Sequence, residues 1–391
     1  MTEALSSGAR RTAVPAVSVE ALFAAPEPAP IVDLRSPAEF AADHVTGARS
    51  VPLFDDVERA LVGRLYRRSS PEAAFAEGRA LASARIARLV GEVALLARWS
   101  VPGGGDLGAR VLEVTRGGYA RFSARATSEP AALPPGAVVL HCWRGGLRSR
   151  SVVAFLRELG LERAVALDGG YKAYRRHVLD ALAALELPPA FVLRGLTGAG
   201  KTLVLRELEA LRPGLTLDLE REAGHRSSLL GMVGLEPCTQ KTFETRLFER
   251  ARRGFGAAVV LEGESRKVGD AIIPERVWRA LSSGTNVELV APRARRVQVL
   301  LDDYLARRED RPQLRAQLAQ VEARMTPRLA LLERFDAGRE AEVVELLLEH
   351  YYDPLYRHSE RDKPYALTVD ASDPAAAAER IAGWIEGRAA G

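Results

Sequence analysis

The sequence has very few cysteines and no long apolar run. Only Cys142 and Cys238 are present among 391 residues, which argues against a disulfide framework and against a structural zinc site. No segment approaches the roughly 20 apolar residues of a membrane-spanning helix, and the N-terminal residues lack the apolar core of a signal peptide. We therefore expect a cytoplasmic protein with no membrane partner.

Lysine is scarce as well, so arginine supplies nearly all of the positive charge. The 55 basic and 51 acidic residues leave a formal net charge of +4. This modest excess is compatible with a nucleic-acid partner, and equally with a composition that is simply rich in arginine and alanine. The length predicts two or three domains, and a hydrophobic content of 47% is ordinary for a globular protein.

A cysteine follows the apolar run at residues 137–140 and leads a glycine-rich loop into a helix expected over 147–159. A free cysteine has a pKa near ~8.5, and a helix N-terminus, loop N–H groups and neighbouring arginines all favour its thiolate. We predict a nucleophile here. The predicted site consists of the catalytic residues Cys142, Arg144 and Arg148 and the anion-binding loop residues Gly145, Gly146 and Leu147.

The spacing in this loop leaves more than one chemistry open. Five residues separate Cys142 from Arg148, which satisfies the His-Cys-x5-Arg-Ser signature of tyrosine-type phosphatases. Such a pocket suits a cysteine that accepts a chalcogen atom as a persulfide-like adduct, or one that attacks a tetrahedral oxyanion. The non-catalytic alternative is an inert cysteine buried in a turn.

A second loop, at residues 195–202, matches the phosphate-binding pattern Gly-x4-Gly-Lys-Thr between an apolar run and an amphipathic helix. Lys201 would neutralise phosphate oxygens, and the Thr202 hydroxyl would hold Mg²⁺ together with Glu262, which ends another predicted strand. No residue is identifiable as a water activator, so diphosphate binding and NTP hydrolysis are both open. The predicted phosphate-binding residues are Gly195, Thr197, Gly198, Ala199, Gly200, Lys201 and Thr202.

The alternation of short apolar runs with helical segments predicts α/β architecture with parallel sheets in both halves. We expect a disordered tail at 1–15, a first domain at 16–186, a linker at Leu187-Pro188-Pro189 and a second domain at 190–391. Residues 71–98 show a helical period, and 106–130 show none. The second domain should have strands at 191–193, 215–219, 257–261 and 286–290, then a largely helical part with long amphipathic stretches at 293–308 and 313–350.

The first half resembles the rhodanese-type sulfurtransferases. The resemblance is carried by Ile31-Val32-Asp33-Leu34-Arg35, by Glu39-Phe40 and by His44-Val45-Thr46-Gly47-Ala48, and it puts Cys142 at the catalytic position. We interpret Asp33 and His44 as scaffold residues, with an ion pair to Arg35 or a packed loop in place of a catalytic role.

The ordered set of motifs resembles the tRNA 2-selenouridine synthases, which fuse a rhodanese-like domain to a P-loop domain. The resemblance runs from about residue 17 to 366. Besides the two loops, it is carried by Asp168-Gly169-Gly170-Tyr171-Lys172, Asp218-Leu219-Glu220, Gly224-His225-Arg226-Ser227-Ser228, Glu262-x-Glu264-Ser265-Arg266 and Tyr351-Tyr352-Asp353-Pro354-Leu355-Tyr356.

This resemblance implies a transferase that replaces the sulfur of 2-thiouridine at the tRNA wobble position by selenium. Selenophosphate would be the donor and geranyl diphosphate a co-substrate, because the sulfur is first S-geranylated. The implied partners are thiolated tRNA and an enzyme that supplies selenophosphate. Residues expected to contact substrate, or to support those that do, are His225, Arg226, Ser227, Glu262, Glu264 and Arg266.

Two other functions compete with this interpretation. One is a phosphatase or general sulfurtransferase fused to an NTPase module, and the other is a non-catalytic RNA-binding or phosphate-sensing protein. Cys238 and the tyrosines at 351–356 are interpreted as packing residues, although a resolving thiol and stacking on an unpaired base are the respective alternatives.

Overall fold

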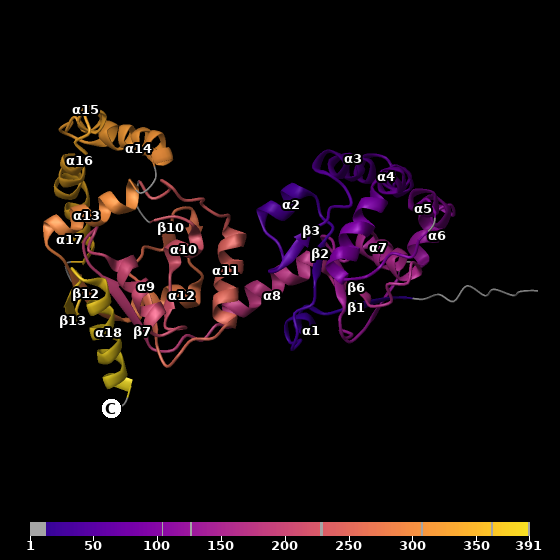
Figure 1. Cartoon of the computed structure of the whole chain (residues 1–391), viewed down its shortest axis with the longest axis horizontal. Coiled ribbons are helices and arrows are strands. Elements are labelled where there is room, and N and C mark those ends of the chain that lie inside the picture. Colours follow the sequence, from indigo (N-terminus) through magenta and orange to yellow (C-terminus); the bar gives the residue numbers. More distant parts are fainter. Residues whose placement is uncertain are drawn as a thin grey trace, which may run out of the picture. The chain divides into compact units, whose positions relative to one another are not determined.

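Two parallel β-sheets form the centres of two units of the chain, residues 1–180 and 181–391. The computed structural model describes residues 13–103, 105–125, 127–226, 230–305, 308–360 and 363–389, and Figure 1 shows its elements. The helix α8 (Gly170–Ala184) runs across the division between the units. Leu187-Pro188-Pro189 follows this helix and precedes the first strand of the second sheet.

The first sheet has the strand order β3-β2-β5-β6-β1-β4, and all of its pairs are parallel. β5 is buried at every residue, as expected for a strand covered on both faces. Residues 14 and 15 belong to β1, so the tail predicted for 1–15 is too long, while residues 1–12 lie outside the described part. The strands are β1 (Val14–Val17), β2 (Ile31–Asp33), β3 (Ala48–Ser50), β4 (Ser128–Pro130), β5 (Val138–His141) and β6 (Ala164–Leu167).

Four helices between β3 and β4 add a helical layer to the first unit: α3 (Asp56–Arg68), α4 (Pro71–Ala97), α5 (Leu107–Val114) and α6 (Gly118–Arg125). α4 confirms the helix predicted over 71–98, and it starts as its sequence dictates, with Ser70 accepting a hydrogen bond from the Ala73 N–H and Pro71 in the first turn. α5 and α6 occupy the segment without a helical period. Each has eight residues, too few to be stable alone, and both pack on α4.

The remaining helices of the first unit are α1 (Val19–Phe23), α2 (Pro37–Ala42) and α7 (Leu147–Glu158). One core joins the sheet to the helical layer, since Val138 and Leu140 of β5, Val153 of α7 and Val93 of α4 are all buried in the same cluster. This packing fixes β5 and α7, the two elements that flank Cys142.

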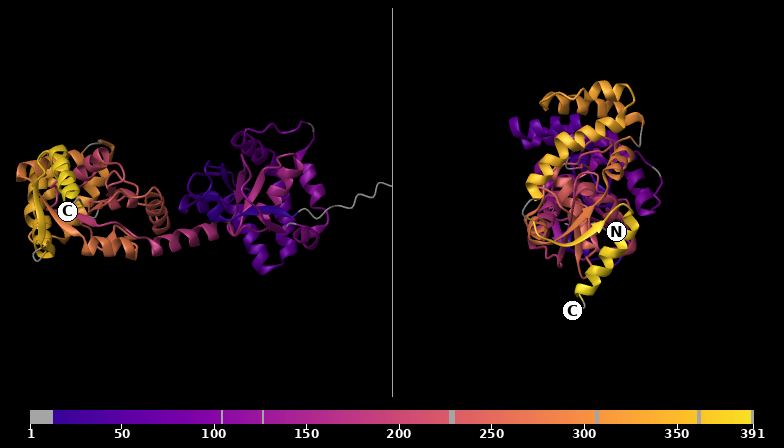
Figure 2. Two further views of the ribbon diagram at one scale, coloured as in Figure 1. Left: turned by 90° about the horizontal axis from the view of Figure 1, so that it is seen from below. Right: turned by 90° about the vertical axis from the view of Figure 1, so that its left-hand side faces the viewer.

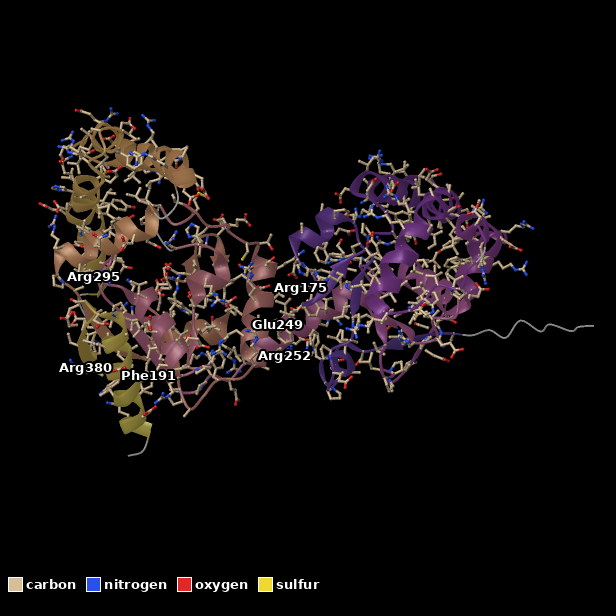
Figure 3. The ribbon with its side chains drawn as sticks, in the orientation of Figure 1. Arg175, Phe191, Glu249, Arg252, Arg295 and Arg380 are labelled. Atoms are coloured by element: carbon tan, nitrogen blue, oxygen red, sulfur yellow. The ribbon has the colours of Figure 1, made fainter. Side chains whose placement is uncertain are left out.

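The second sheet has the order β13-β12-β7-β9-β8, again all parallel. β7, β8, β9 and β12 confirm the four predicted strands, whereas the edge strand β13 was not predicted. Phe191 of β7 is labelled in Figure 3. Its ring packs edge-on against that of Trp384 in the last helix, with ring centroids 5.5 Å apart. The strands are β7 (Ala190–Arg194), β8 (Thr216–Leu217), β9 (Val259–Glu262), β12 (Thr285–Val290) and β13 (Tyr365–Asp370).

The helices α14, α15 and α16 gather apart from this sheet (Figures 1 and 2) and share a separate apolar core with α13. The amphipathic stretch predicted over 313–350 is largely helical, as expected, and it is divided into α14, α15, α16 and the first residues of the π-helical turn. The chain turns after α14, where Pro327 cannot continue a helix, and again at Gly338, which has a φ of +74°. These helices are α13 (Arg293–Tyr304), α14 (Arg311–Arg324), α15 (Leu331–Asp336), α16 (Glu340–Leu347) and, after a π-helical turn, α17 (Asp353–Glu360).

The other elements of the second unit are α9 (Lys201–Leu211), α10 (Leu219–Ala223), α11 (Gln240–Arg252), α12 (Glu275–Ser283), α18 (Pro374–Ala389) and the short hairpin β10 (Lys267–Val268) and β11 (Ala271–Ile272). Among the described residues, no helix combines the length and the apolar character that crossing a membrane requires.

Candidate functional site

Cys142 lies between the end of β5 and the start of α7, in a loop of residues 142–148 that we call the Cys142 loop. Its side chain is only 3% exposed, and its Sγ lies 3.3 Å from the Ser149 hydroxyl oxygen. Gly145 has a φ of +61°, and a Cβ there would lie 2.8 Å from the Leu167 carbonyl oxygen. Only glycine therefore lets the loop fold this tightly around the sulfur.

The pKa of the Cys142 thiol is lowered from its ordinary value. Burial raises this pKa, but the charge of Arg148, the hydrogen bonds from Ser149 and the backbone N–H of residue 144 together outweigh burial. The side chain of Arg144 is exposed, so this residue acts on the sulfur through its backbone. The arrangement favours a thiolate.

The motif at residues 168–172 is hydrogen-bonded to the backbone of the Cys142 loop. The N–H groups of Tyr171 and Lys172 donate hydrogen bonds to the carbonyl oxygens of Cys142 and Trp143, at 3.0 and 2.9 Å. Gly170 has a φ of +58°, and a Cβ there would lie 2.4 Å from the Cys142 carbonyl oxygen. The motif thus fixes the backbone that carries the nucleophile.

Tyr171 of this motif also takes part in a buried polar network with Arg35 and Asp43. Arg35 forms the expected ion pair with Asp33, at 2.5 Å, and donates a second hydrogen bond to the Asp43 carbonyl oxygen at 2.8 Å. Its guanidinium carbon lies 3.8 Å from the ring centre of Tyr171, whose hydroxyl donates to the Asp43 carboxylate at 2.7 Å. The ring of His44 stacks on Phe40. The expected ion pair between Asp33 and Arg35 and the packing of His44 are therefore confirmed, and the absence of a catalytic role for Asp33 and His44 stays a prediction.

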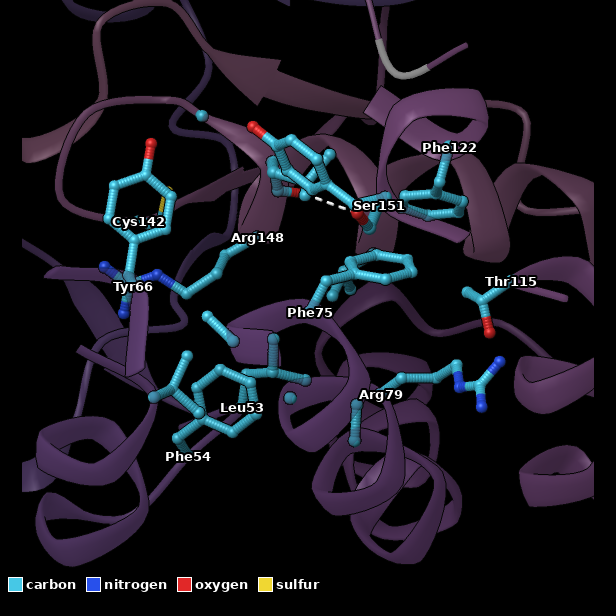
Figure 4. Close-up of a pocket in the computed structure, with 18 of the residues that line it drawn as sticks. Leu53, Phe54, Tyr66, Phe75, Arg79, Thr115, Phe122, Cys142, Arg148 and Ser151 are labelled. Carbon is cyan, nitrogen blue, oxygen red and sulfur yellow. Dashed lines mark hydrogen bonds between the residues drawn. The ribbon is translucent and has the colours of Figure 1, made fainter. Parts of the chain in front are cut away.

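Cys142 also forms part of the wall of a cavity of about 690 Å³ within the first unit. The other walls come from α3, α4, α5, α6 and α7. In the view of Figure 4, Cys142, Arg148 and Tyr66 lie toward one end and Arg79 and Thr115 toward the other. The low exposure of Cys142 thus means shielding from bulk water, while the thiol still faces a space large enough for a ligand.

The phosphate loop, residues 195–202, leads from β7 into α9. Lys201 donates a hydrogen bond to the Gly195 carbonyl oxygen at 3.1 Å. Burial lowers the pKa of Lys201. Tyr356 and the carboxylates of Glu262, Glu264 and Glu220 raise this pKa by more than burial lowers it, so the pKa lies above its ordinary value. The Lys201 side chain is therefore protonated, and it lies at the N-terminus of α9, where a phosphate group would be favoured.

Two residues of the C-terminal helices complete this loop. Arg296 of α13 donates to the Thr197 carbonyl oxygen at 2.9 Å and pairs with Asp353 of α17. The Lys201 ammonium lies 5.2 Å from the ring centre of Tyr356. No pattern in the sequence indicates Arg296, because no local spacing links this residue to the loop. Tyr356 was predicted to pack against helices or, as the alternative, to stack on an unpaired base.

Three carboxylates lie close together near Lys201. Ligand oxygens of Glu220, Glu262 and Glu264 all lie within 4.8 Å of one another, and Glu262 Oε1 is buried with no hydrogen-bond partner among the described residues. Burial raises the pKa of Glu262 well above its ordinary value, and Glu220, Asp218 and Glu264 raise it further. A divalent cation fits this set of oxygens, with Thr202 at the start of α9 as the predicted additional ligand.

The other predicted residues lie elsewhere in the second unit. Arg226 pairs with Asp303 at 2.6 Å, and Arg266 pairs with Glu275 at 3.0 Å. The ring of His225 lies against Gly269, where a Cβ would come within 2.7 Å of it. Ser227 lies outside the described residues, so its predicted role stays a prediction.

The residues interpreted as packing residues do contact protein atoms. The Cys238 thiol donates a hydrogen bond to the Glu222 carbonyl oxygen at 3.3 Å. Tyr352 is buried in the core of the C-terminal helices, and the Tyr351 ring packs against it at 5.1 Å. Ser149 was missed as a site residue, although it is the serine of the Cys-x5-Arg-Ser signature and could have been found there.

Comparison with known proteins agrees with the resemblance seen in the motifs. Residues 188–334 match a family model described as the tRNA 2-selenouridine synthase AAA domain. The tRNA 2-selenouridine synthase of Chromohalobacter salexigens is 31% identical, over 86% of this chain and 89% of the relative. That of Cupriavidus pinatubonensis is also 31% identical, over 92% of this chain and 95% of the relative. The chain belongs to the tRNA 2-selenouridine synthase family.

Proposed function

We propose that this protein is an enzyme that replaces the C2 sulfur of a tRNA wobble 2-thiouridine by selenium. The observation that carries the proposal is Cys142: a buried thiol with a lowered pKa, on the wall of a cavity, in a chain whose relatives are named tRNA 2-selenouridine synthases. A second anion site at the phosphate loop supports a reaction with two phosphorylated co-substrates, selenophosphate and geranyl diphosphate.

The first step of the proposal is alkylation of the thiouridine sulfur. The sulfur attacks C1 of geranyl diphosphate, the S–C bond forms, the C1–O bond breaks, diphosphate leaves and the base gives up its N3 proton to solvent. The phosphate loop holds the diphosphate through its N–H groups and Lys201. Alkylation turns the sulfur from a poor leaving group into a thiolate leaving group.

Thr202 and Glu262, with Glu264 and Glu220 beside it, are the residues that would hold Mg²⁺. Their oxygens are the ligand type this cation prefers. The cation supplies charge neutralisation for the departing diphosphate. Lys201 neutralises the same group from the protein side, and its closeness to these carboxylates keeps it protonated.

The second step replaces sulfur by selenium at the Cys142 loop. The Cys142 thiolate attacks C2 of the alkylated base, the C2–S bond to the geranyl sulfur breaks, and geranyl thiolate leaves and takes a proton from solvent to give geranyl thiol. The selenium of selenophosphate then attacks C2 and releases the Cys142 thiolate, after which water cleaves the Se–P bond and phosphate departs. Arg144 and Arg148 hold the phosphoryl oxygens, and an enzyme that makes selenophosphate must supply the donor.

Mass spectrometry of digested nucleosides tests this function. The purified protein is incubated with thiolated tRNA, geranyl diphosphate and selenophosphate, and 2-selenouridine is the expected product. Cys142→Ala should abolish selenouridine and leave S-geranyl-2-thiouridine to accumulate, while Lys201→Ala should weaken geranylation. Absence of both modified bases with the folded wild-type protein would reject the function.

The phosphatase and sulfurtransferase alternatives are measured with the same preparation. Turnover of an aryl phosphate, or of thiosulfate with cyanide, that exceeds the tRNA reaction would favour them. Steady ATP hydrolysis that Lys201→Ala removes would assign the phosphate loop to an NTPase.

A further inference from the structure

The cavity beside Cys142 is far larger and more apolar than a cysteine loop that binds only an oxyanion needs. Seven aromatic side chains line it, among them Phe54, Tyr66, Phe75, Phe122 and Trp143. Its volume of about 690 Å³ falls in the range of roughly 300–1,000 Å³ typical of pockets that enclose small organic ligands. A selenophosphate ion occupies only a small part of such a space.

The charge around the cavity is uneven. Arg144 and Arg148 of the Cys142 loop contribute to the wall and lie beside the sulfur in sequence. Arg59 and Arg67 of α3 and Arg79 of α4 add further cations to the wall, and Glu158 at the end of α7 adds an acidic group. Tyr66 is an aromatic residue of the wall that also contacts solvent, since it is 57% exposed. The cavity therefore offers cations for an anionic group near the sulfur and aromatic surface for a hydrocarbon chain, so it suits an amphipathic ligand.

We propose that this cavity binds the ten-carbon isoprenoid chain of the S-geranylated base, an inference that rests on the function proposed above. The thioether sulfur then lies next to the Cys142 thiol, and the chain extends between α3, α4 and α6. The same apolar walls hold the geranyl thiol after it leaves. The proposed occupant is the chain carried by the base, and the chain of geranyl diphosphate is the alternative occupant that the experiment below tests.

This assignment gives the four helices between β3 and β4 a function in substrate binding. α3 through α6 supply Tyr66, Phe75, Phe122 and Val111 to the wall, and they are additional to the strands and helices that hold the Cys142 loop. They make the Cys142 loop selective for an alkylated base, because burial of a hydrocarbon chain in apolar surface is favourable.

Gly63 of α3 offers the sharpest test. It lines the cavity, and a Cβ at this position has no heavy atom within 4 Å. A phenylalanine there would enter open space, and a helix tolerates this replacement of glycine. The matched control is Gly91 of α4, which is exposed, does not line the cavity and also has no heavy atom within 4 Å of a Cβ.

The experiment compares two short anticodon stem–loop RNAs, one with S-geranyl-2-thiouridine and one with S-methyl-2-thiouridine, on the full-length protein. The wild type should bind the geranylated RNA at least about tenfold more tightly. Gly63→Phe should remove most of this preference and leave binding of the methylated RNA unchanged, whereas Gly91→Phe should change neither. In the reaction with selenophosphate, Gly63→Phe should lower kcat/KM for the geranylated RNA by about the same factor as it lowers the binding preference. Gly91→Phe should leave this kcat/KM unchanged.

Equal binding of the two RNAs by the wild type would overturn the inference, as would a Gly63→Phe variant that keeps the preference. Competition by geranyl diphosphate that Gly63→Phe removes and Lys201→Ala does not would assign the cavity to the diphosphate instead. A clear preference lost in Gly63→Phe, without any selenouridine formed, would keep the cavity assignment and reject the proposed function.

Discussion

Arg296 and Asp353 form a buried ion pair, with 2.5 Å between Nη2 and Oδ1, that attaches the C-terminal helices to the phosphate loop. The same guanidinium donates to the Thr197 carbonyl oxygen at 2.9 Å. A Cβ at Gly198 would lie 2.7 Å from the Arg296 carbonyl oxygen, so the loop backbone and α13 are in direct contact. The geometry of the phosphate loop thus depends on residues about a hundred positions away in the sequence.

Asp353→Ala should therefore destabilise the second unit and weaken diphosphate binding together. Removing one partner of a buried pair leaves the other charge uncompensated, at a cost of about 3 kcal/mol. Chemical denaturation and calorimetry with inorganic diphosphate measure the two effects. Asp336→Ala is the control, because Asp336 pairs with Arg315 in an exposed position and should change little. Unchanged diphosphate affinity in a destabilised Asp353→Ala would show that the pair has no role at the loop.

The pH dependence of Cys142 alkylation should follow from the charge of Arg148. Because the pKa of Cys142 is lowered, its reaction with iodoacetamide should set in at lower pH than that of a free cysteine. Arg148→Ala removes the largest of the influences that lower this pKa, so the profile should move to higher pH. Mass spectrometry of the Cys142 peptide gives the profile, and Arg144→Ala should move it less. A profile that is the same in all three proteins would contradict the role of Arg148.

Gly170→Ala tests the support that residues 168–172 give to the Cys142 loop. Gly170 and Gly160 both have positive φ, of +58° and +100°, but only at Gly170 would a Cβ meet another residue, the Cys142 carbonyl oxygen at 2.4 Å. Alanine should cost about 1 kcal/mol of strain at either position. Gly170→Ala should also displace the nucleophile and lower selenouridine formation by about a hundredfold, whereas Gly160→Ala should retain activity. Equal activity of the two variants would show that the motif does not position Cys142.

Local patterns predicted where both candidate loops lie, because both loops are short and each follows an apolar strand and opens a helix. Residues 142–148 and 195–202 lie where their sequences place them, and four strands of the second sheet were predicted. α5 and α6, at eight residues each, carry no readable period, because tertiary packing on α4 stabilises them. The cavity therefore could not be predicted, since its walls come from helices that only the fold brings together.

Long-range contacts explain the other differences. β13 pairs with β12 across more than seventy residues, and its half-buried alternation is weak beside the helical segments before it. Tyr356 is one of several tyrosines in one motif, and only its position over Lys201 separates it from Tyr352, which is buried in a core. The sequence around Arg266 does not indicate its ion pair with Glu275, because Glu275 lies on the following helix, α12.

The carboxylates near Lys201 predict a specific response to Mg²⁺. Glu262→Gln keeps the shape of the side chain and removes its charge, so the Mg²⁺ concentration for half-maximal geranylation should rise by at least about tenfold. The variant should be no less stable to heat than the wild type, because burial and the charges of Glu220, Asp218 and Glu264 all oppose ionisation of Glu262. Glu275→Gln, on an exposed carboxylate, serves as the control and should leave the Mg²⁺ requirement unchanged. Geranylation that proceeds at full rate in excess EDTA would contradict a cation role for this cluster, and a Glu262→Gln variant with an unaltered Mg²⁺ requirement would exclude Glu262 as its ligand.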